Sequence, residues 1–109
     1  MAVYTQKLQL VCDYIQRHLD EDLDVDRLSQ IAALSKFHFH RIFAIHVGLN
    51  VMKFIQLSRL KRASFQLAFE PDLKIIEIAL QAGFDSPEAF TRAFKRSFDQ
   101  TPRAFRDKP

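Results

Sequence analysis

Two stretches of this chain carry the same pattern of residues, one about 50 positions after the other. A shift of 51 residues places Ser35 on Ser86 and Arg41 on Arg92. The same shift superimposes four further residue pairs: Phe39 on Phe90, Phe43 on Phe94, Asn50 on Thr101 and Phe54 on Phe105. Upstream the shift falls to 50, because the second copy has one extra turn residue, Asp85. Such self-similarity indicates one supersecondary unit that occurs twice.

Each copy has the periodicity of two helices joined by a tight turn. One face of the segment 35–47 is apolar at helical spacing, through Phe39, Ile42, Phe43 and Val47. Ser35 is suited to cap the start of this helix, and Gly48 to end it. In the second copy, Ser86-Pro87-Glu88 combines a cap, a proline at the first helical position and a first-turn acid. The pattern therefore predicts two helix-turn-helix units.

The rest of the chain also reads as helical, which predicts an all-α fold. Only 2 glycines and 4 prolines interrupt 109 residues, and 48% of the residues are hydrophobic, enough for a core. We expect helices over residues 5–19, 25–32, 36–47, 51–69, 75–81 and 87–98, and a short last turn after Thr101. Asp24 and Asn50 are the expected caps of the second and fourth of these helices.

Charge is distributed unevenly along the chain. Residues 1–33 hold three basic and six acidic residues, a net charge of −3. Residues 34–109 hold 13 basic and 7 acidic residues, a net charge of +6. The acidic run 20–26 reads as a solvated turn. The basic excess coincides with the candidate recognition helices, as expected of a protein that binds a polyanion.

Several function classes find no support in the sequence. The single cysteine, Cys12, cannot form an internal disulfide, which fits the cytoplasm. No apolar run reaches the ~20 residues of a membrane span, and no signal peptide opens the chain. His38 and His40 diverge on a helix, whereas paired ligands need a spacing of four. Because no catalytic set or phosphate loop is present either, we expect no enzyme, no cofactor and no metal site.

The outer face of the segment 35–47 is the first candidate binding surface. It combines an aromatic ring, an imidazole, a guanidinium and a small residue: Phe37, His40, Arg41 and Ala44. These groups suit a DNA base edge, and Lys36 at the positive helix N-terminus would face the same ligand. The competing interpretation is a helical interaction adaptor whose exposed Phe37 and basic faces bind an acidic protein partner.

The helix between the two copies determines whether both can reach one ligand. Residues 51–69 form a helix of about 28 Å at 1.5 Å per residue. Successive major grooves on one side of B-DNA lie roughly 34 Å apart. The two recognition helices are therefore predicted to enter adjacent grooves of one duplex, which bends to make up the difference.

Almost the whole chain resembles the AraC/XylS family of bacterial transcription regulators. The second copy carries the more specific motifs: Arg59-Leu60-x-Arg62-Ala63, Ile75-x-Glu77-Ile78-Ala79, Gly83-Phe84-x-Ser86, Phe90-x-Arg92-Ala93-Phe94-Lys95-Arg96-x-Phe98 and Thr101-Pro102-x-x-Phe105-Arg106. The first copy is similar to its counterpart in the same proteins through Ser35, His38, Arg41 and Phe43 before Gly48.

The resemblance implies a seven-helix domain over residues 1–109. A first helix-turn-helix subdomain (5–49), a linker helix (50–70) and a second subdomain (71–109) would make it up. By analogy, bases would be read by Lys36, Phe37, His40 and Arg41 in one groove and by Pro87, Glu88, Thr91 and Arg92 in the other. Phosphate contacts are expected from Lys53, Lys95, Arg96 and Arg106, which otherwise form a solvated rim. The implied function is sequence-specific binding of double-stranded DNA, most often as an activator that contacts RNA polymerase, for which the acidic run 20–26 is a candidate surface.

Four departures from the family pattern qualify these expectations. Ala33 stands at a turn position where the family often has glycine, and Val51-Met52 replaces the usual pair after the first unit. Lys74 replaces a small helix cap. Pro87-Glu88 is a poor pair for base reading, so the second recognition helix is expected to contribute mainly position and phosphate contact. Because relatives carry an effector-binding domain, the chain is either a freestanding regulator or one from which that domain is absent.

Overall fold

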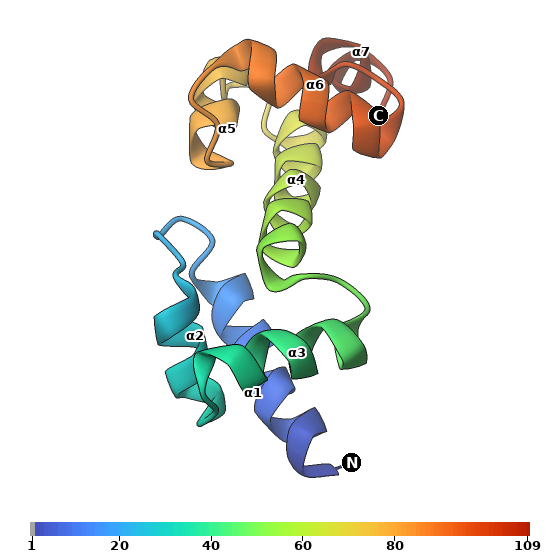
Figure 1. The fold of residues 1–109 in the computed structure, drawn as a ribbon. Helices are drawn as coiled ribbons and strands as arrows, with labels where there is room; N and C mark the ends of the chain where they lie inside the picture. Colours follow the sequence, from blue (N-terminus) through green and yellow to red (C-terminus); the bar gives the residue numbers. More distant parts are fainter. Residues whose placement is uncertain (1) are drawn as a thin grey trace. The chain divides into compact units, whose positions relative to one another are not determined.

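The computed structural model describes residues 2–109 and is helical throughout, which confirms the predicted all-α fold (Figure 1). Seven helices occur in this part of the chain: α1 (Ala2–Arg17), α2 (Val25–Ala32), α3 (Lys36–Val47), α4 (Val51–Phe69), α5 (Ile75–Gln81), α6 (Pro87–Phe98) and α7 (Pro102–Asp107). None of them is both long and apolar enough to cross a membrane.

The bounds of α1 differ from the prediction, which placed this helix over residues 5–19. The helix ends at Arg17, and the chain then turns through hydrogen bonds from His18 N to Ile15 O and from Glu21 N to His18 O. Leu19 nevertheless remains buried, because the turn folds it back onto the core. The hydrophobic pattern therefore continued past the true end of the helix.

Contacts divide the chain into two compact units, residues 1–55 and 56–109, and the boundary falls within α4. The division into two subdomains joined by a separate linker helix stays a prediction. In the first unit, α1, α2 and α3 pack together around the buried rings of Phe39 and Phe43. Val51 and Ile55, from the first turns of α4, complete this core.

The second unit has a core of the same kind, built around Phe90 and Phe94 of α6. The Phe94 ring stacks on Phe98 at 4.5 Å between ring centroids and meets Phe105 of α7 edge-on at 5.4 Å. The last three turns of α4 supply Leu60, Ala63 and Leu67 to this core. The four phenylalanines of α3 and α6 that the repeat aligns are thus the fully buried centres of the two units.

The helix starts confirm the predicted caps. In all five, a short side-chain oxygen accepts a hydrogen bond from the backbone N–H three residues later, and Asn50 also accepts from the backbone N–H two residues later. The capping residues are Asp24, Ser35, Asn50, Ser86 and Thr101. At α5, Lys74 has no acceptor to offer, and the Glu77 carboxylate instead accepts from the Lys74 N–H at 3.4 Å.

The turns of the two units also match, bond for bond. Leu34 N donates to Ser29 O at 3.0 Å, and Phe84 N donates to Ala79 O at 3.1 Å. Both turns need a left-handed residue, supplied by Ala33 (φ 56°) in the first and Gly83 (φ 88°) in the second. The departure noted at Ala33 therefore places a residue with a Cβ in a conformation that favours glycine.

Candidate nucleic-acid interface

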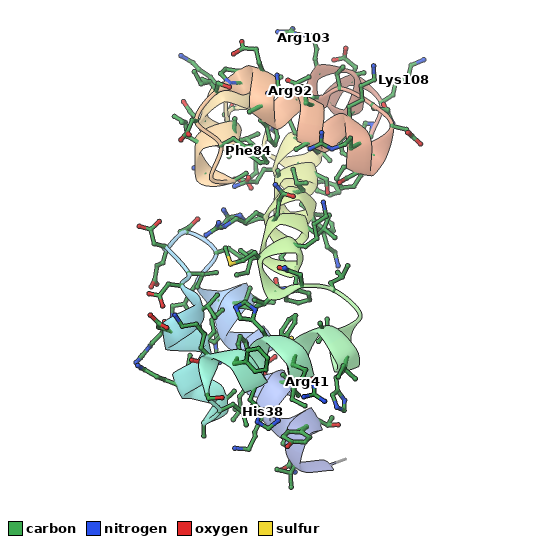
Figure 2. The ribbon with its side chains drawn as sticks, in the orientation of Figure 1. His38, Arg41, Phe84, Arg92, Arg103 and Lys108 are labelled. Carbon is green, nitrogen blue, oxygen red and sulfur yellow. The ribbon has the colours of Figure 1, made fainter. Side chains whose placement is uncertain are left out.

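The outer face of α3 is solvent-exposed along its length, as the sequence predicted. Phe39 and Phe43 turn inward, which fixes the rotation of the helix and directs the opposite side to solvent. The exposed residues on that side are Lys36, Phe37, His40, Arg41 and Ala44. Figure 2 labels Arg41 on this helix. The residues predicted to read bases in the first unit are thus brought together on one face.

Lys36 has a partner that the sequence did not reveal. Its ammonium lies 3.0 Å from the carboxylate of Asp26 on α2, and both side chains are exposed. An exposed ion pair of this kind contributes about 0–1 kcal/mol to stability and exchanges readily with other partners. Lys36 can therefore transfer to a ligand on this face, but it must give up Asp26 to do so.

His38 points away from the outer face and contacts α1. Its Nε2 lies 3.5 Å from the Tyr4 hydroxyl, and the two rings meet edge-on with centroids 5.7 Å apart. His38 is half-buried, whereas His40 is exposed, so the two rings diverge as predicted. No cluster of three residues able to hold a metal ion occurs within residues 2–109.

The outer face of α6 is more strongly charged. Glu88 and Arg92 are exposed, while Pro87 and Thr91 are half-buried. Figure 2 labels Arg92. Lys95 and Arg96 follow one turn later, and with Arg92 and Asp99 they line an open hollow of about 420 Å³. Three cations in adjacent turns of one helix form a surface suited to the phosphates of a nucleic acid backbone.

The two remaining candidates for phosphate contacts, Lys53 and Arg106, differ in the hydrogen bonds that they make within the protein. Lys53 is exposed in the first turn of α4, and its backbone N–H is held by the Asn50 cap. Arg106 is half-buried, and its guanidinium donates to Leu67 O at 3.2 Å and to Glu70 O at 3.1 Å. It therefore ties α7 to the C-terminal end of α4, where helix carbonyls lack partners. This structural role explains Arg106 without DNA.

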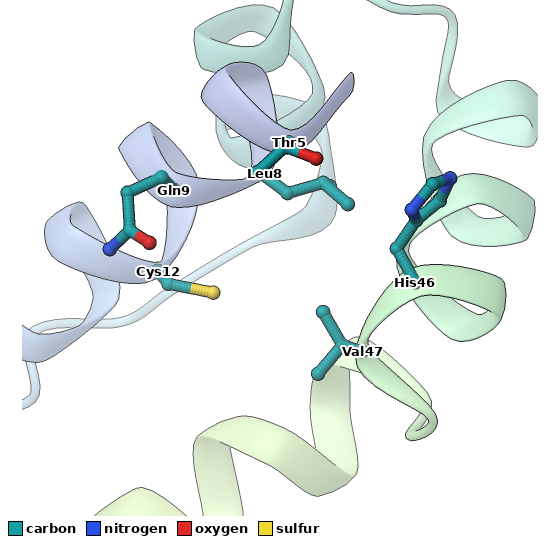
Figure 3. A pocket seen from close by; sticks show the side chains of 6 residues that line it. All are labelled: Thr5, Leu8, Gln9, Cys12, His46 and Val47. Atoms are coloured by element: carbon teal, nitrogen blue, oxygen red, sulfur yellow. The ribbon is translucent and has the colours of Figure 1, made fainter. Parts of the chain in front are cut away.

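A hollow of about 220 Å³ lies between α1 and the end of α3, within the first unit (Figure 3). Its lining residues are Thr5, Leu8, Gln9, Cys12, His46 and Val47. Burial, and secondarily the charge of Asp13, raise the pKa of the Cys12 thiol. The thiol is therefore held in its neutral, poorly nucleophilic form, in keeping with a residue that fills space.

Sequence reasoning missed one residue of the α3 face. Ile45 is 65% exposed, although its neighbours Ile42 and Phe43 pack inward. Its position eight residues after Phe37 and four after Arg41 places it on their face. That spacing was available in the sequence, but an isoleucine beside core residues is easily assigned to the core.

Comparison with known proteins identifies the fold. The family described as "Helix-turn-helix domain" matches residues 28–108. A transcriptional regulator from Chromobacterium violaceum, described as an AraC-type DNA-binding domain-containing protein, superimposes with a TM-score of 0.89 at 26% identity, covering 99% of this chain and 96% of that one. The chain belongs to the AraC/XylS family. The chain therefore forms a helix-turn-helix DNA-binding domain of the kind found in transcription regulators, and this family is not a class of enzymes.

Two further proteins are similar to this AraC-type domain over most of its length. The DNA-binding domain of the global transcriptional factor AdpA, solved with a target DNA, has a TM-score of 0.79 at 30% identity, over 89% of this chain and 86% of that one. The uncharacterized HTH-type transcriptional regulator YbfP of Bacillus subtilis is 41% identical over 94% of this chain. The chain spans 35% of YbfP and 14% of a similar Staphylococcus aureus regulator.

Proposed function

We propose that this AraC-type domain binds double-stranded DNA sequence-specifically, with α3 and α6 in successive major grooves of one duplex. One observation carries the proposal: Arg41 and Arg92 occupy equivalent positions of the repeat, and both are exposed on the side opposite a buried phenylalanine pair. Arginine is the residue that most often reads guanine, through paired hydrogen bonds in the major groove.

The length of α4 supports the spacing between the two contacts. Its 19 residues span about 28 Å. Grooves on one side of B-DNA lie roughly 34 Å apart, so the proposal includes a bend in the duplex. Bending 20–30 base pairs costs on the order of 1–6 kcal/mol, which contacts from a second helix can offset. A circular-permutation assay tests this part, and straight DNA in the complex would contradict it.

In this proposal α3 contributes more to base discrimination than α6 does. On α3, Phe37, His40 and Arg41 read bases, and Lys36 supports them at the helix start. On α6, Arg92 reads a base, while Pro87, Glu88 and Thr91 face the groove and contribute little to the discrimination of bases. Phosphate contacts come from the cations of the second unit and the start of α4: Lys53, Lys95, Arg96 and the remaining capacity of Arg106.

The wider role follows the family. We propose that the domain acts in the cytoplasm as part of an activator, working through contact with RNA polymerase, and that an effector-binding domain controls it in the whole protein. The AdpA domain was solved with a target DNA, which supports the choice of DNA over an acidic protein as partner. The alternative is a helical adaptor that binds an acidic protein partner through the exposed Phe37 and the basic faces.

Salt dependence separates these two candidates. We expect affinity for a random-sequence duplex to fall with salt at a log–log slope near −0.9 per phosphate contact. Titration of a labelled duplex, followed by fluorescence anisotropy at several salt concentrations, measures this slope. An adaptor would show little duplex affinity at any salt. Arg41→Ala should then cost about 1–3 kcal/mol on a selected site. Equal losses on selected and random duplex would show that Arg41 is no reader.

A further inference from the structure

The two recognition helices place different residues around the same arginine. The repeat aligns three exposed apolar residues of α3 with three charged residues of α6: Phe37 with Glu88, Ala44 with Lys95, and Ile45 with Arg96. The fold is the same in both units, and the buried phenylalanines that orient each helix are equivalent. The difference therefore lies in what each outer face contacts.

The apolar residues of α3 are exposed without a structural reason. Phe37 is 81% and Ile45 65% exposed, whereas the core beneath them is already filled by Phe39 and Phe43. Phe37 lies one turn before Arg41 and Ile45 one turn after it, so the two flank the guanidinium on the same face. Ile45 is eight residue steps after Phe37, a rise of about 12 Å along the helix, or three to four base pairs at roughly 3.4 Å each.

In the major groove, the apolar group that base pairs present is the 5-methyl of thymine. An aromatic or aliphatic side chain that meets a cytosine amine or a guanine oxygen gains no such contact. We infer that α3 selects thymine methyls on either side of the base pair that Arg41 contacts, through Phe37 and Ile45. The inference rests on the proposed function and deepens it by naming what the first half-site contains.

The experiment replaces thymine by deoxyuridine, which removes only the methyl group. Duplexes enriched by the protein from a random pool are resynthesised with one deoxyuridine at a time, and their affinities are measured by anisotropy. Arg41→Ala identifies one base pair of the site, the one at which this variant loses its sequence preference. At the thymines beside that base pair, each deoxyuridine should weaken binding about three- to fivefold, the effect of leaving one methyl unburied. Deoxyuridine in the other half-site should change affinity less than about 1.5-fold, which controls for altered duplex flexibility.

Two variants assign the effect to its residues. Phe37→Ala and Ile45→Ala should each remove the dependence on one thymine, and they should fold normally because both side chains are exposed. Deoxyuridine tolerated at every position, or a dependence that survives in both variants, would overturn the inference while leaving DNA binding intact. If the pool yields no enriched duplex, the proposed function itself fails, a result distinct from either of these.

Discussion

At the scale of single residues, left-handed turn positions show where this sequence is strained. Ala33 holds a φ of 56° that glycine adopts without penalty. A left-handed conformation costs an L-residue about 1–2 kcal/mol, which glycine avoids. Glycine also makes the unfolded chain more flexible, and this offsets about 0.4–1 kcal/mol of the gain in stability. Ala33→Gly should therefore stabilise the protein by about 0.5–1 kcal/mol, measured by urea unfolding.

The matched control is the equivalent position of the second unit. Gly83→Ala should destabilise by about 0.5–1 kcal/mol because φ is 88° there, while the added Cβ would meet Arg59 Nη1 at 3.4 Å, an ordinary contact distance that adds no clash. Opposite signs at the two positions would attribute both effects to the turn conformation. If Ala33→Gly destabilised the protein, the strain argued for Ala33 would be wrong.

The ion pair between Lys36 and Asp26 gives a second prediction at this scale. Asp26→Asn should leave unfolding within about 1 kcal/mol, because both side chains are exposed. It should tighten binding of a random duplex severalfold, since Lys36 becomes available and a negative charge leaves the start of α3. Asp13→Asn on α1 makes the same charge change elsewhere. Equal tightening by both variants would show a general charge effect only.

At the scale of elements, the contact between α7 and α4 assigns a role to Arg106. Arg106→Ala removes two hydrogen bonds to carbonyls near the end of α4. We expect a loss of about 1–3 kcal/mol in the free energy of unfolding, measured with urea. Arg96→Ala, on the exposed face of α6, should lower duplex affinity and leave unfolding unchanged. An unchanged free energy of unfolding in Arg106→Ala would show that these two hydrogen bonds do not hold α7 to α4.

Helix starts were more predictable from the sequence than helix ends or surface pairs. Ser35 and Ser86 are recognisable caps because the signal lies within four residues of chain. The end of α1 was misplaced because Leu19 is buried from a turn, which depends on tertiary packing. The partners of Lys36 and Arg106 lie on other helices, so local spacing could not predict them. Ile45 was missed because an isoleucine next to core residues suggests the buried face of α3, whereas it lies on the exposed one.

At the scale of the whole molecule, the repeat accounts for two cores of the same design on one chain. Its buried residues could be predicted because each must recur at helical spacing in both copies. Charge is distributed unevenly over this chain, with a net charge of −3 over residues 1–33 and +6 over the rest, so the basic excess falls on the part that holds α3 and α6. A repeat of this kind presents two outer helix faces on the same fold, each with an exposed arginine, which suits a ligand that is itself periodic.

Selection of duplexes from a random pool with the wild type, Arg41→Ala and Arg92→Ala tests the central claim most directly. We predict that the wild type enriches a site with two conserved guanines about 10 base pairs apart, one helical turn of DNA. Each variant should lose preference at one guanine and keep it at the other. Loss of the same position in both variants, or an unchanged site in either, would contradict the insertion of two arginine-bearing helices into successive grooves.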